Sequence, residues 1–202
     1  MKQYPSIPST GKDVAQMYIF DKLDGSNLRF EYDHKLGWHK FGTRQQMLLP
    51  THQTFGSAIS MFLETFSQPL ENVARQQGWT NFTAFCEFWG QQSFAGFHQT
   101  GDPKFLSLID LQVYKRGLIE PVQFLELFDE LPAPRFLGVH QWDTAFLETV
   151  RTNQLEGISF EGVIGKVGSG HGRLMRKAKT QNWLDAVRQR FDESQALAIL
   201  RS

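Results

Sequence analysis

The sequence predicts an α+β fold formed by one domain over residues 1–202. Apolar stretches typical of strands and longer segments with helical spacing are mixed along the chain without a strict alternation of strand and helix. The chain contains 18 Phe and 5 Trp among 202 residues, which favours a well-packed globule over a disordered chain. This length suffices to bury a full core and fits a single domain.

The first part of the chain predicts an irregular lead-in, two strands and a long helix. Proline and glycine interrupt residues 1–16, so no regular element is expected there. Apolar stretches on both sides of Asp24-Gly25-Ser26-Asn27 predict strand, turn and strand over 17–32. Apolar side chains at helical spacing predict one amphipathic helix over 55–76. These side chains are Phe55, Ile59, Phe62, Leu63, Phe66, Leu70 and Val73.

The later elements continue the mixed pattern. Buried strands are expected at 82–89 and 104–114, because both segments are rich in Phe, Leu and Ile. A short helix follows at 121–130, then a strand near 136–141 and a helix near 143–152. Strands at 158–167 and 173–178 are joined by a glycine-rich turn at 168–172. Thr180 is an expected N-cap for a closing helix that carries Trp183 and Val187.

Charge and cysteine content narrow the functional classes. The single cysteine, Cys86, cannot form an internal disulfide, and we interpret it as a core residue of a protein in a reducing, cytoplasmic setting (the host cytoplasm if a phage encodes it). No apolar run is long enough to span a membrane, and the N-terminus has no signal-peptide pattern. Net charge is zero, but residues 166–190 hold seven basic residues and one acid, which indicates a polyanionic partner.

Six short peptides in a fixed order describe a covalent nucleotide pocket. They are Lys22-Leu23-Asp24-Gly25-Ser26-Asn27, Arg44, Glu87-Phe88-Trp89-Gly90, Leu108-Ile109-Asp110, Glu161-Gly162-Val163-Ile164-Gly165-Lys166 and Lys177-Ala178-Lys179. A lysine that attacks the α-phosphate of a nucleoside triphosphate must be neutral, so the pKa of Lys22 must fall. Lys177 and Lys179 alternate along a predicted strand and therefore share one face. Opposite Lys22, these cations would disfavour its protonation and hold the triphosphate oxygens.

The acidic residues and Arg44 suit the rest of this reaction. Charge builds on the leaving pyrophosphate and calls for a divalent metal and basic side chains. Glu161 and Glu87 are candidate carboxylates for Mg²⁺ or Mn²⁺, and Glu87 alternatively accepts hydrogen bonds from the ribose hydroxyls. Arg44 offers a planar fork for phosphate or ribose oxygens, and Asp110 either serves the site or anchors a buried hydrogen-bond network.

These motifs resemble those of the covalent nucleotidyltransferase superfamily, which contains ATP-dependent polynucleotide ligases and mRNA capping enzymes. Within it, the chain is most similar to the RNA ligase family typified by the second RNA ligase of phage T4. The residues 22–25 match the nucleophile motif Lys-x-(Asp/His)-Gly, and Ser26-Asn27 matches the pair that follows it in RNA ligases of this type. The resemblance extends over residues 22–179.

The resemblance implies a nucleotidyltransferase (ATP-grasp-like) domain of two mainly antiparallel sheets flanked by helices. It also implies three steps: AMP is transferred from ATP to Lys22, then to a 5′-phosphate, and a 3′-hydroxyl finally expels it. Lys22, Lys177 and Lys179 are the expected catalytic residues. The resemblance places Asp21 beside the adenine amino group. The expected nucleotide-binding residues are Asp21, Leu23, Asp24, Asn27, Arg44, Glu87, Ile109, Lys166, Lys177 and Lys179.

Two departures from the family pattern define the alternatives. Ile109 stands where the family carries an aromatic residue that stacks on adenine, and only 23 residues follow Lys179. We therefore expect no C-terminal oligonucleotide-binding or helical domain, so that strand binding uses the catalytic domain, a partner protein, or nothing at all. We also expect a monomer. The expected partners are ATP and RNA ends. A minimal DNA ligase and a non-catalytic nucleotide- or RNA-binding relative are the alternatives.

Overall fold

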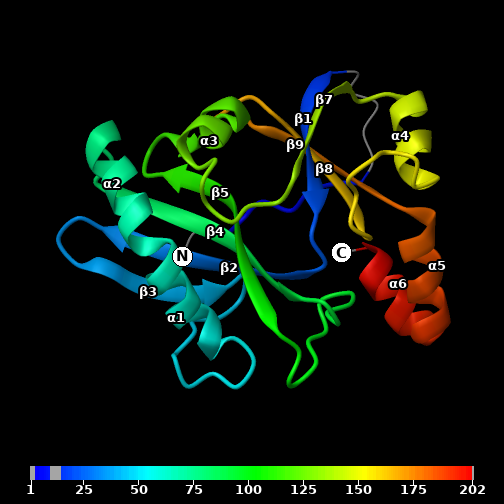
Figure 1. The fold of residues 1–202 in the computed structure, drawn as a ribbon, viewed down its shortest axis with the longest axis horizontal. Coiled ribbons are helices and arrows are strands. Elements are labelled where there is room, and N and C mark those ends of the chain that lie inside the picture. The colour runs from blue at the N-terminus through cyan, green and yellow to red at the C-terminus, as the bar shows by residue number, and fades with distance from the viewer. Residues whose placement is uncertain (1–2, 10–14, 202) are drawn as a thin grey trace.

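A computed structural model describes residues 3–9 and 15–201 as two antiparallel sheets with helices packed around them (Figure 1). The four-stranded sheet has the order β7 (Phe136–Gln141), β1 (Gln16–Lys22), β8 (Gly162–Val167) and β9 (Leu174–Lys179). The five-stranded sheet has the order β3 (Gly37–Thr43), β2 (Gly25–Asp33), β4 (Asn81–Gly90), β5 (Lys104–Val113) and β6 (Gly117–Leu118). The predicted α+β class with two antiparallel sheets is confirmed.

The chain passes from one sheet to the other at the first candidate motif. Lys22 ends β1 in the four-stranded sheet, and Gly25 begins β2 in the five-stranded sheet. The predicted strands are therefore present, but they do not form a hairpin, and Ser26 and Asn27 belong to β2 instead of a turn. A Cβ at Gly25 would lie 2.3 Å from the Phe88 carbonyl oxygen, so only glycine fits this crossover.

Helices α1 (Gly56–Thr65) and α2 (Ser67–Gln77) cover one face of the five-stranded sheet, on the left in Figure 1. The prediction of one continuous helix over 55–76 is wrong at Phe66, where both helices meet. Pro69 explains the break, because its ring cannot donate a backbone hydrogen bond to Thr65 and clashes with that carbonyl in a continuous helix.

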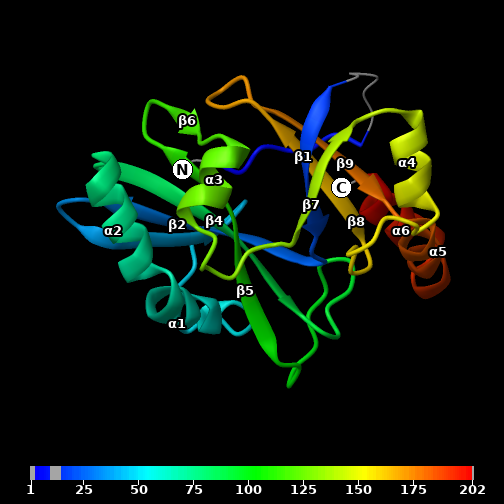
Figure 2. The same ribbon diagram turned by 45° about the horizontal axis from the view of Figure 1, so that its top comes forward.

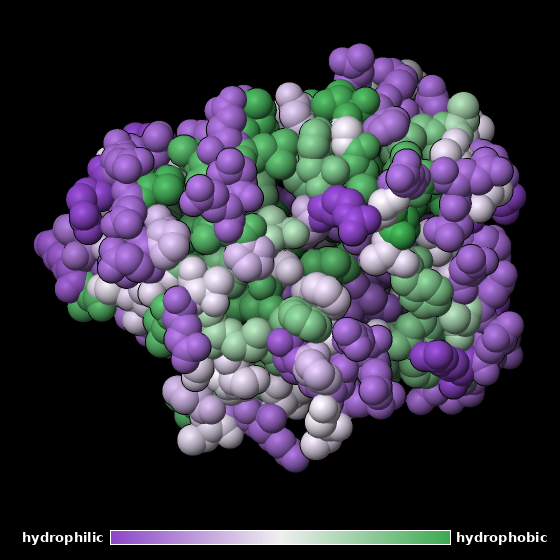
Figure 3. Space-filling model, viewed as in Figure 1, coloured by the Kyte–Doolittle hydropathy of each residue, from purple (hydrophilic) through white to green (hydrophobic). Residues whose placement is uncertain are grey.

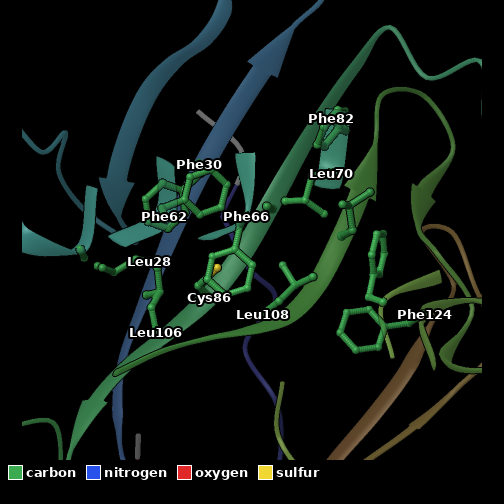
Figure 4. Close-up of a cluster of buried hydrophobic side chains, with 14 of the residues drawn as sticks. Leu28, Phe30, Phe62, Phe66, Leu70, Phe82, Cys86, Leu106, Leu108 and Phe124 are labelled. Carbon is green, nitrogen blue, oxygen red and sulfur yellow. The ribbon is translucent and has the colours of Figure 1, made fainter. Parts of the chain in front are cut away.

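The main core lies between these helices and the sheet. Figure 4 shows Phe62, Phe66 and Leu70 packed over β2, β4 and β5. The rings of Phe30 and Phe62 are stacked with centroids 3.8 Å apart. Cys86 is fully buried in this cluster, which confirms its interpretation as a core residue.

The remaining helices flank the four-stranded sheet and its end. The helix α3 (Pro121–Leu127) contributes Phe124 to the main core, and α4 (Thr144–Arg151) packs Phe146 and Val150 on Met17 and Ile19 of β1. Thr180 caps α5 (Gln181–Arg190) by accepting from the backbone N–H of Trp183, as predicted. The sequence analysis missed the final helix, α6 (Glu193–Arg201), and the strands β3 and β6.

The four-stranded sheet places the last motifs beside the first. Strands β8 and β9 pair antiparallel, as predicted, although β8 begins at Gly162 and not at residue 158. Strand β1 pairs with β8, so Lys22, Gly162 and Lys179 form one row across three strands. Figure 2 shows these strands crossing next to the five-stranded sheet. Among the described residues, no helix is long and apolar enough to cross a membrane.

Candidate active site

A cavity of about 220 Å³ opens between the two sheets and contains most of the predicted motifs. The four-stranded sheet contributes Phe20, Lys22, Ile164, Lys166 and Lys177 to its walls, and the five-stranded sheet contributes Gly25, Asn27, Glu87 and Ile109. Arg44, which directly follows β3, also lines it. Residues as far apart in sequence as Phe20 and Lys177 thus meet around one space that can hold a small molecule.

Lys22 is held in an ion-pair cluster at this cavity. Its Nζ donates to Oε2 of Glu161 at 2.7 Å, and Nζ of Lys179 lies 3.4 Å from Oε1 of the same carboxylate. Gly162 stands between the two lysines in the row across the sheet, and a Cβ there would lie 2.0 Å from the Ala178 carbonyl oxygen. The missing side chain at Gly162 therefore permits the close approach of β8 and β9 beneath the cluster.

The charge state of Lys22 differs from the sequence-based prediction. Burial opposes its positive charge, but the carboxylates of Glu161, Glu87 and Asp24 outweigh burial and raise the pKa of Lys22. The amine is thus protonated in the nucleotide-free protein at neutral pH. The prediction of a lowered pKa is wrong for this state, because the neighbouring carboxylates outweigh burial.

Lys177 and Lys179 lie on one face of β9, as the strand alternation predicts, and this is the face of the sheet that also carries Lys22. Both are nearly buried, and burial, Lys179 and Lys22 lower the pKa of Lys177 to about 8. Burial also lowers the pKa of Lys179, whose Nζ lies 3.8 Å from the centre of the Trp183 ring. Lys177 lines the cavity, whereas Lys179 lies behind it, against Glu161.

Glu87 and Glu161 bring two carboxylates to the lysine cluster. Burial, together with repulsion from Glu161 and Asp24, raises the pKa of Glu87 to about 8 against the attraction of Lys22 and the amide of Asn27. Their oxygen donors suit a hard divalent cation such as Mg²⁺ or Mn²⁺. No group of three or more potential His, Cys, Asp or Glu ligands occurs in the described part of the chain, so the remaining ligands would be phosphate oxygens and water.

Asp110 anchors a buried network at the far wall of the cavity. Its carboxylate accepts from Arg173 Nη1 at 2.7 Å, Tyr4 Oη at 3.0 Å and Lys166 Nζ at 3.1 Å. Lys166 also donates to the Ile109 carbonyl oxygen at 2.6 Å, and burial lowers its pKa. The structure therefore supports the network interpretation of Asp110, with Lys166 and Ile109 at the cavity wall.

Two residues predicted to contact the nucleotide, Asp21 and Asp24, accept hydrogen bonds from other parts of the protein. Asp21 accepts from the backbone N–H of Ser159 at 2.9 Å, and its side chain faces Val163 and the α4 core, opposite to Lys22. Asp21 also lines the cavity, and its expected contact with adenine stays a prediction. Asp24 accepts from Trp183 Nε1 at 2.6 Å and does not line the cavity, whereas Leu23 does.

The N-terminal segment adds residues that the sequence analysis missed. Tyr4, Pro5 and Ile7 line the cavity, and the Pro8 carbonyl oxygen accepts from the backbone N–H of Lys177. The Tyr4 ring packs 4.9 Å from that of Phe85. Residues 3–9 have no regular secondary structure, and their contacts lie far away in the sequence, at Phe85, Asp110 and Lys177, so no local pattern indicates this role.

The arrangement of the two sheets and their helices is similar to the fold of solved RNA ligases. Among solved structures, a Naegleria gruberi RNA ligase with pyrophosphate is similar, with a TM-score of 0.67 and 12% sequence identity over 94% of this chain and 59% of that chain. A mutant of that ligase with AMP and Mn gives a TM-score of 0.65 at 12% identity over 92% and 58% of the two chains. Another mutant, with ATP and Mn, gives 0.63 at 14% identity over 87% and 52%.

These similarities concern the fold, and this chain spans just over half the length of the ligases it matches. No family model matches the sequence, and no curated protein matches it.

Proposed function

We propose that this chain is the nucleotidyltransferase unit of an ATP-dependent RNA ligase, with Lys22 as the residue that carries AMP. The observation that carries this proposal is the position of Lys22 at a cavity between the sheets, within one cluster with Lys177, Lys179, Glu161 and Glu87. A surface lysine needs no such surroundings, whereas a lysine that attacks phosphorus needs both cations and carboxylates near it. The solved RNA ligases with ATP, AMP and Mn support the same class of chemistry.

In the first step, the neutral amine of Lys22 would form a P–N bond to the α-phosphorus of ATP. The bond between that phosphorus and the bridging oxygen would break, and pyrophosphate would leave with its electron pair. Because Lys22 is paired with Glu161 in the free protein, the amine must first leave this carboxylate and lose its proton. Lys177 and Lys179 disfavour protonation of Lys22 once that pair is broken.

Glu161 and Glu87 would hold the divalent cation. When bound, Mg²⁺ or Mn²⁺ would neutralise phosphate oxygens and the charge of these carboxylates. Glu87 fits this role because burial and the neighbouring carboxylates raise its pKa in the free protein, and a bound cation would favour its ionised form. Arg44 and Lys177 supply further positive charge at the cavity wall for the phosphates.

The base would occupy the apolar part of the same cavity. Phe20, Ile109 and Ile164 line it, and the Tyr4 ring is held beside Ile109 by the hydrogen bond to Asp110. Ile109 stands where an aromatic residue is expected, but Phe20 and Tyr4 provide aromatic surface from other segments. Leu23 and Asn27 contribute from the crossover and from β2.

Incubation with α-labelled ATP and Mg²⁺ or Mn²⁺, followed by a denaturing gel, tests the proposal. We expect label on the wild-type chain and on Lys35→Ala, an exposed lysine control, and none on Lys22→Ala. Absence of label from the wild-type chain with either metal would contradict the proposal and favour a non-catalytic nucleotide-binding relative.

The later steps follow from the same proposal. AMP would pass from Lys22 to a 5′-phosphate, and attack by a 3′-hydroxyl would form the phosphodiester and release AMP. A panel of nicked RNA, DNA and hybrid duplexes tests the substrate: sealing of RNA nicks supports an RNA ligase, and sealing confined to DNA would assign the chain to DNA ligases.

A further inference from the structure

A second cavity, of about 490 Å³, borders the candidate nucleotide site. Asp21, Leu23 and Pro134 line both cavities, so the segment that leads through Lys22 separates two spaces. The larger cavity is not needed for ATP in the proposal above. Its position next to the nucleophile is where a substrate that receives AMP must approach.

Two aromatic side chains, Trp89 and Phe160, line this cavity. The Trp89 indole is fixed by a 3.0 Å hydrogen bond from Nε1 to Oγ of Ser107, and its ring lies 4.8 Å from that of Phe105. Phe160 also lines the cavity and is 42% exposed, which is high for an aromatic side chain that packs in a core. Fixed and accessible rings of this kind are suited to stacking on a nucleobase.

Polar groups complete the lining. Arg135 is exposed and provides a cation, and Ser93 and Ser159 provide hydroxyl groups for ribose or phosphate oxygens. The two acids at the cavity, Asp21 and Asp24, already accept hydrogen bonds from protein N–H groups. Their negative charge is therefore partly compensated within the protein.

A third cavity extends this surface beyond the first base. It shares Trp89, Ser107 and Ala133 with the second cavity and continues past the exposed side of Phe105 to Met61. In Figure 3, apolar side chains are exposed in the middle of the molecule's face, in the region between the sheets. The continuous surface has room for a base next to the terminal one.

We propose that the second cavity binds the terminal nucleoside of the 5′-phosphorylated RNA strand, with its base stacked on Trp89 and Phe160 and its phosphate between Arg135 and Lys22. This assignment rests on the proposed ligase function, since it places the 5′-phosphate beside the lysine that would deliver AMP. It assigns strand-end recognition to the catalytic unit itself.

Binding of fluorescent RNA without ATP tests this site separately from adduct formation. The probe is a 5′-phosphorylated single-stranded RNA with 2-aminopurine as the first base, and a second probe carries it as the last base. We expect quenching of the first-base probe only. Phe160→Ser and Arg135→Gln should each raise the dissociation constant about fivefold or more. Tyr114→Ser and Arg151→Gln, exposed residues outside the cavity, are matched controls.

The labelling of Lys22 by ATP should remain within about twofold of wild type in Phe160→Ser and Arg135→Gln, because neither side chain lines the nucleotide cavity. Unchanged RNA affinity in both variants, or quenching of the last-base probe instead, would overturn the assignment while leaving the ligase proposal intact. Quenching of the first base by a protein that never forms the AMP adduct would support the binding site and reject the ligase function.

Discussion

The amine of Lys22 lies 2.7 Å from Oε2 of Glu161, a partner 139 positions away in the sequence. The same carboxylate lies 3.4 Å from Lys179, so one buried anion holds two lysines of the cluster. This ion pair stabilises the protonated form of the candidate nucleophile. Reaction with ATP therefore requires that the ion pair between Lys22 and Glu161 break.

Glu161→Gln should lower the pKa of Lys22 in the nucleotide-free protein. The substitution removes an attraction that raises this pKa and leaves burial and the neighbouring lysines, which lower it. A fall of one pKa unit would make the amine about tenfold more reactive toward an acylating reagent near neutral pH. Peptide mass spectrometry after brief acylation measures this. Glu148→Gln, at an exposed glutamate, is the control, and equal labelling of Lys22 in all three proteins would refute the prediction.

The same Glu161→Gln variant should lose labelling by ATP despite its more reactive lysine, because the carboxylate proposed to hold the cation is gone. We expect a decrease of at least about tenfold, measured with α-labelled ATP at several Mn²⁺ concentrations. A variant that is labelled faster by both acylating reagent and ATP would show that Glu161 only restrains Lys22.

Glu87→Gln should change how stability depends on pH. The Glu87 pKa is raised from 4.5 to about 8, so the folded state keeps a proton that the unfolded chain releases. The resulting contribution to stability is fully present below about pH 4.5 and is lost as pH rises toward 8. Relative to wild type, Glu87→Gln should therefore gain more than about 2 kcal/mol between pH 5 and 8.

Urea unfolding in the presence of a chelator measures this difference, with Glu126→Gln on the exposed side of α3 as the control. Subtraction of the wild-type curve removes the groups that titrate in both proteins. A constant difference between Glu87→Gln and wild type over this range would disprove a strongly raised pKa.

Asp110→Asn should destabilise the fold by about 3 kcal/mol, because Lys166 and Arg173 would remain buried without their anion. The free energy of unfolding in urea tests this, with Asp129→Asn at an exposed position expected to change it by less than about 0.5 kcal/mol. Equal stability of the two variants would mean that Asp110 does not hold the network together.

Gly25→Ala should cost about 1–3 kcal/mol, because the added methyl group would meet the Phe88 carbonyl oxygen and the Trp89 side chain at the crossover between the sheets. Gly172→Ala is the matched control, since a Cβ there has no neighbour within 4 Å. Thermal unfolding of both variants separates them, and an undisturbed Gly25→Ala protein would contradict the described packing.

The sequence was informative where local periodicity determines the structure. Strand alternation placed Lys177 and Lys179 on one face, and the turn at 168–172 paired β8 with β9, as the structure confirms. Local patterns failed where a single residue or a distant partner determines the end of a helix or the pairing of a strand. Pro69 divides the predicted helix, and the strands on either side of Asp24 pair with different sheets through Val163 and Trp89.

The electrostatics of the site depend on such distant partners. The residue types around Lys22 suggested neighbouring cations and hence a lowered pKa, but the nearest charge is the Glu161 carboxylate. Likewise, Tyr4 and Arg173 reach Asp110 from segments 106 and 63 positions away. Motif order can predict which residues meet, whereas their hydrogen-bond partners and charge states require the three-dimensional arrangement.

The most direct measurement is to incubate the full chain with ATP and Mg²⁺ or Mn²⁺, digest it, and analyse the peptides by mass spectrometry. We predict one AMP bound through a phosphoramidate on the peptide that contains Lys22, and its removal by added pyrophosphate. An unmodified Lys22 under these conditions, or AMP attached reproducibly to a different residue, would contradict the account.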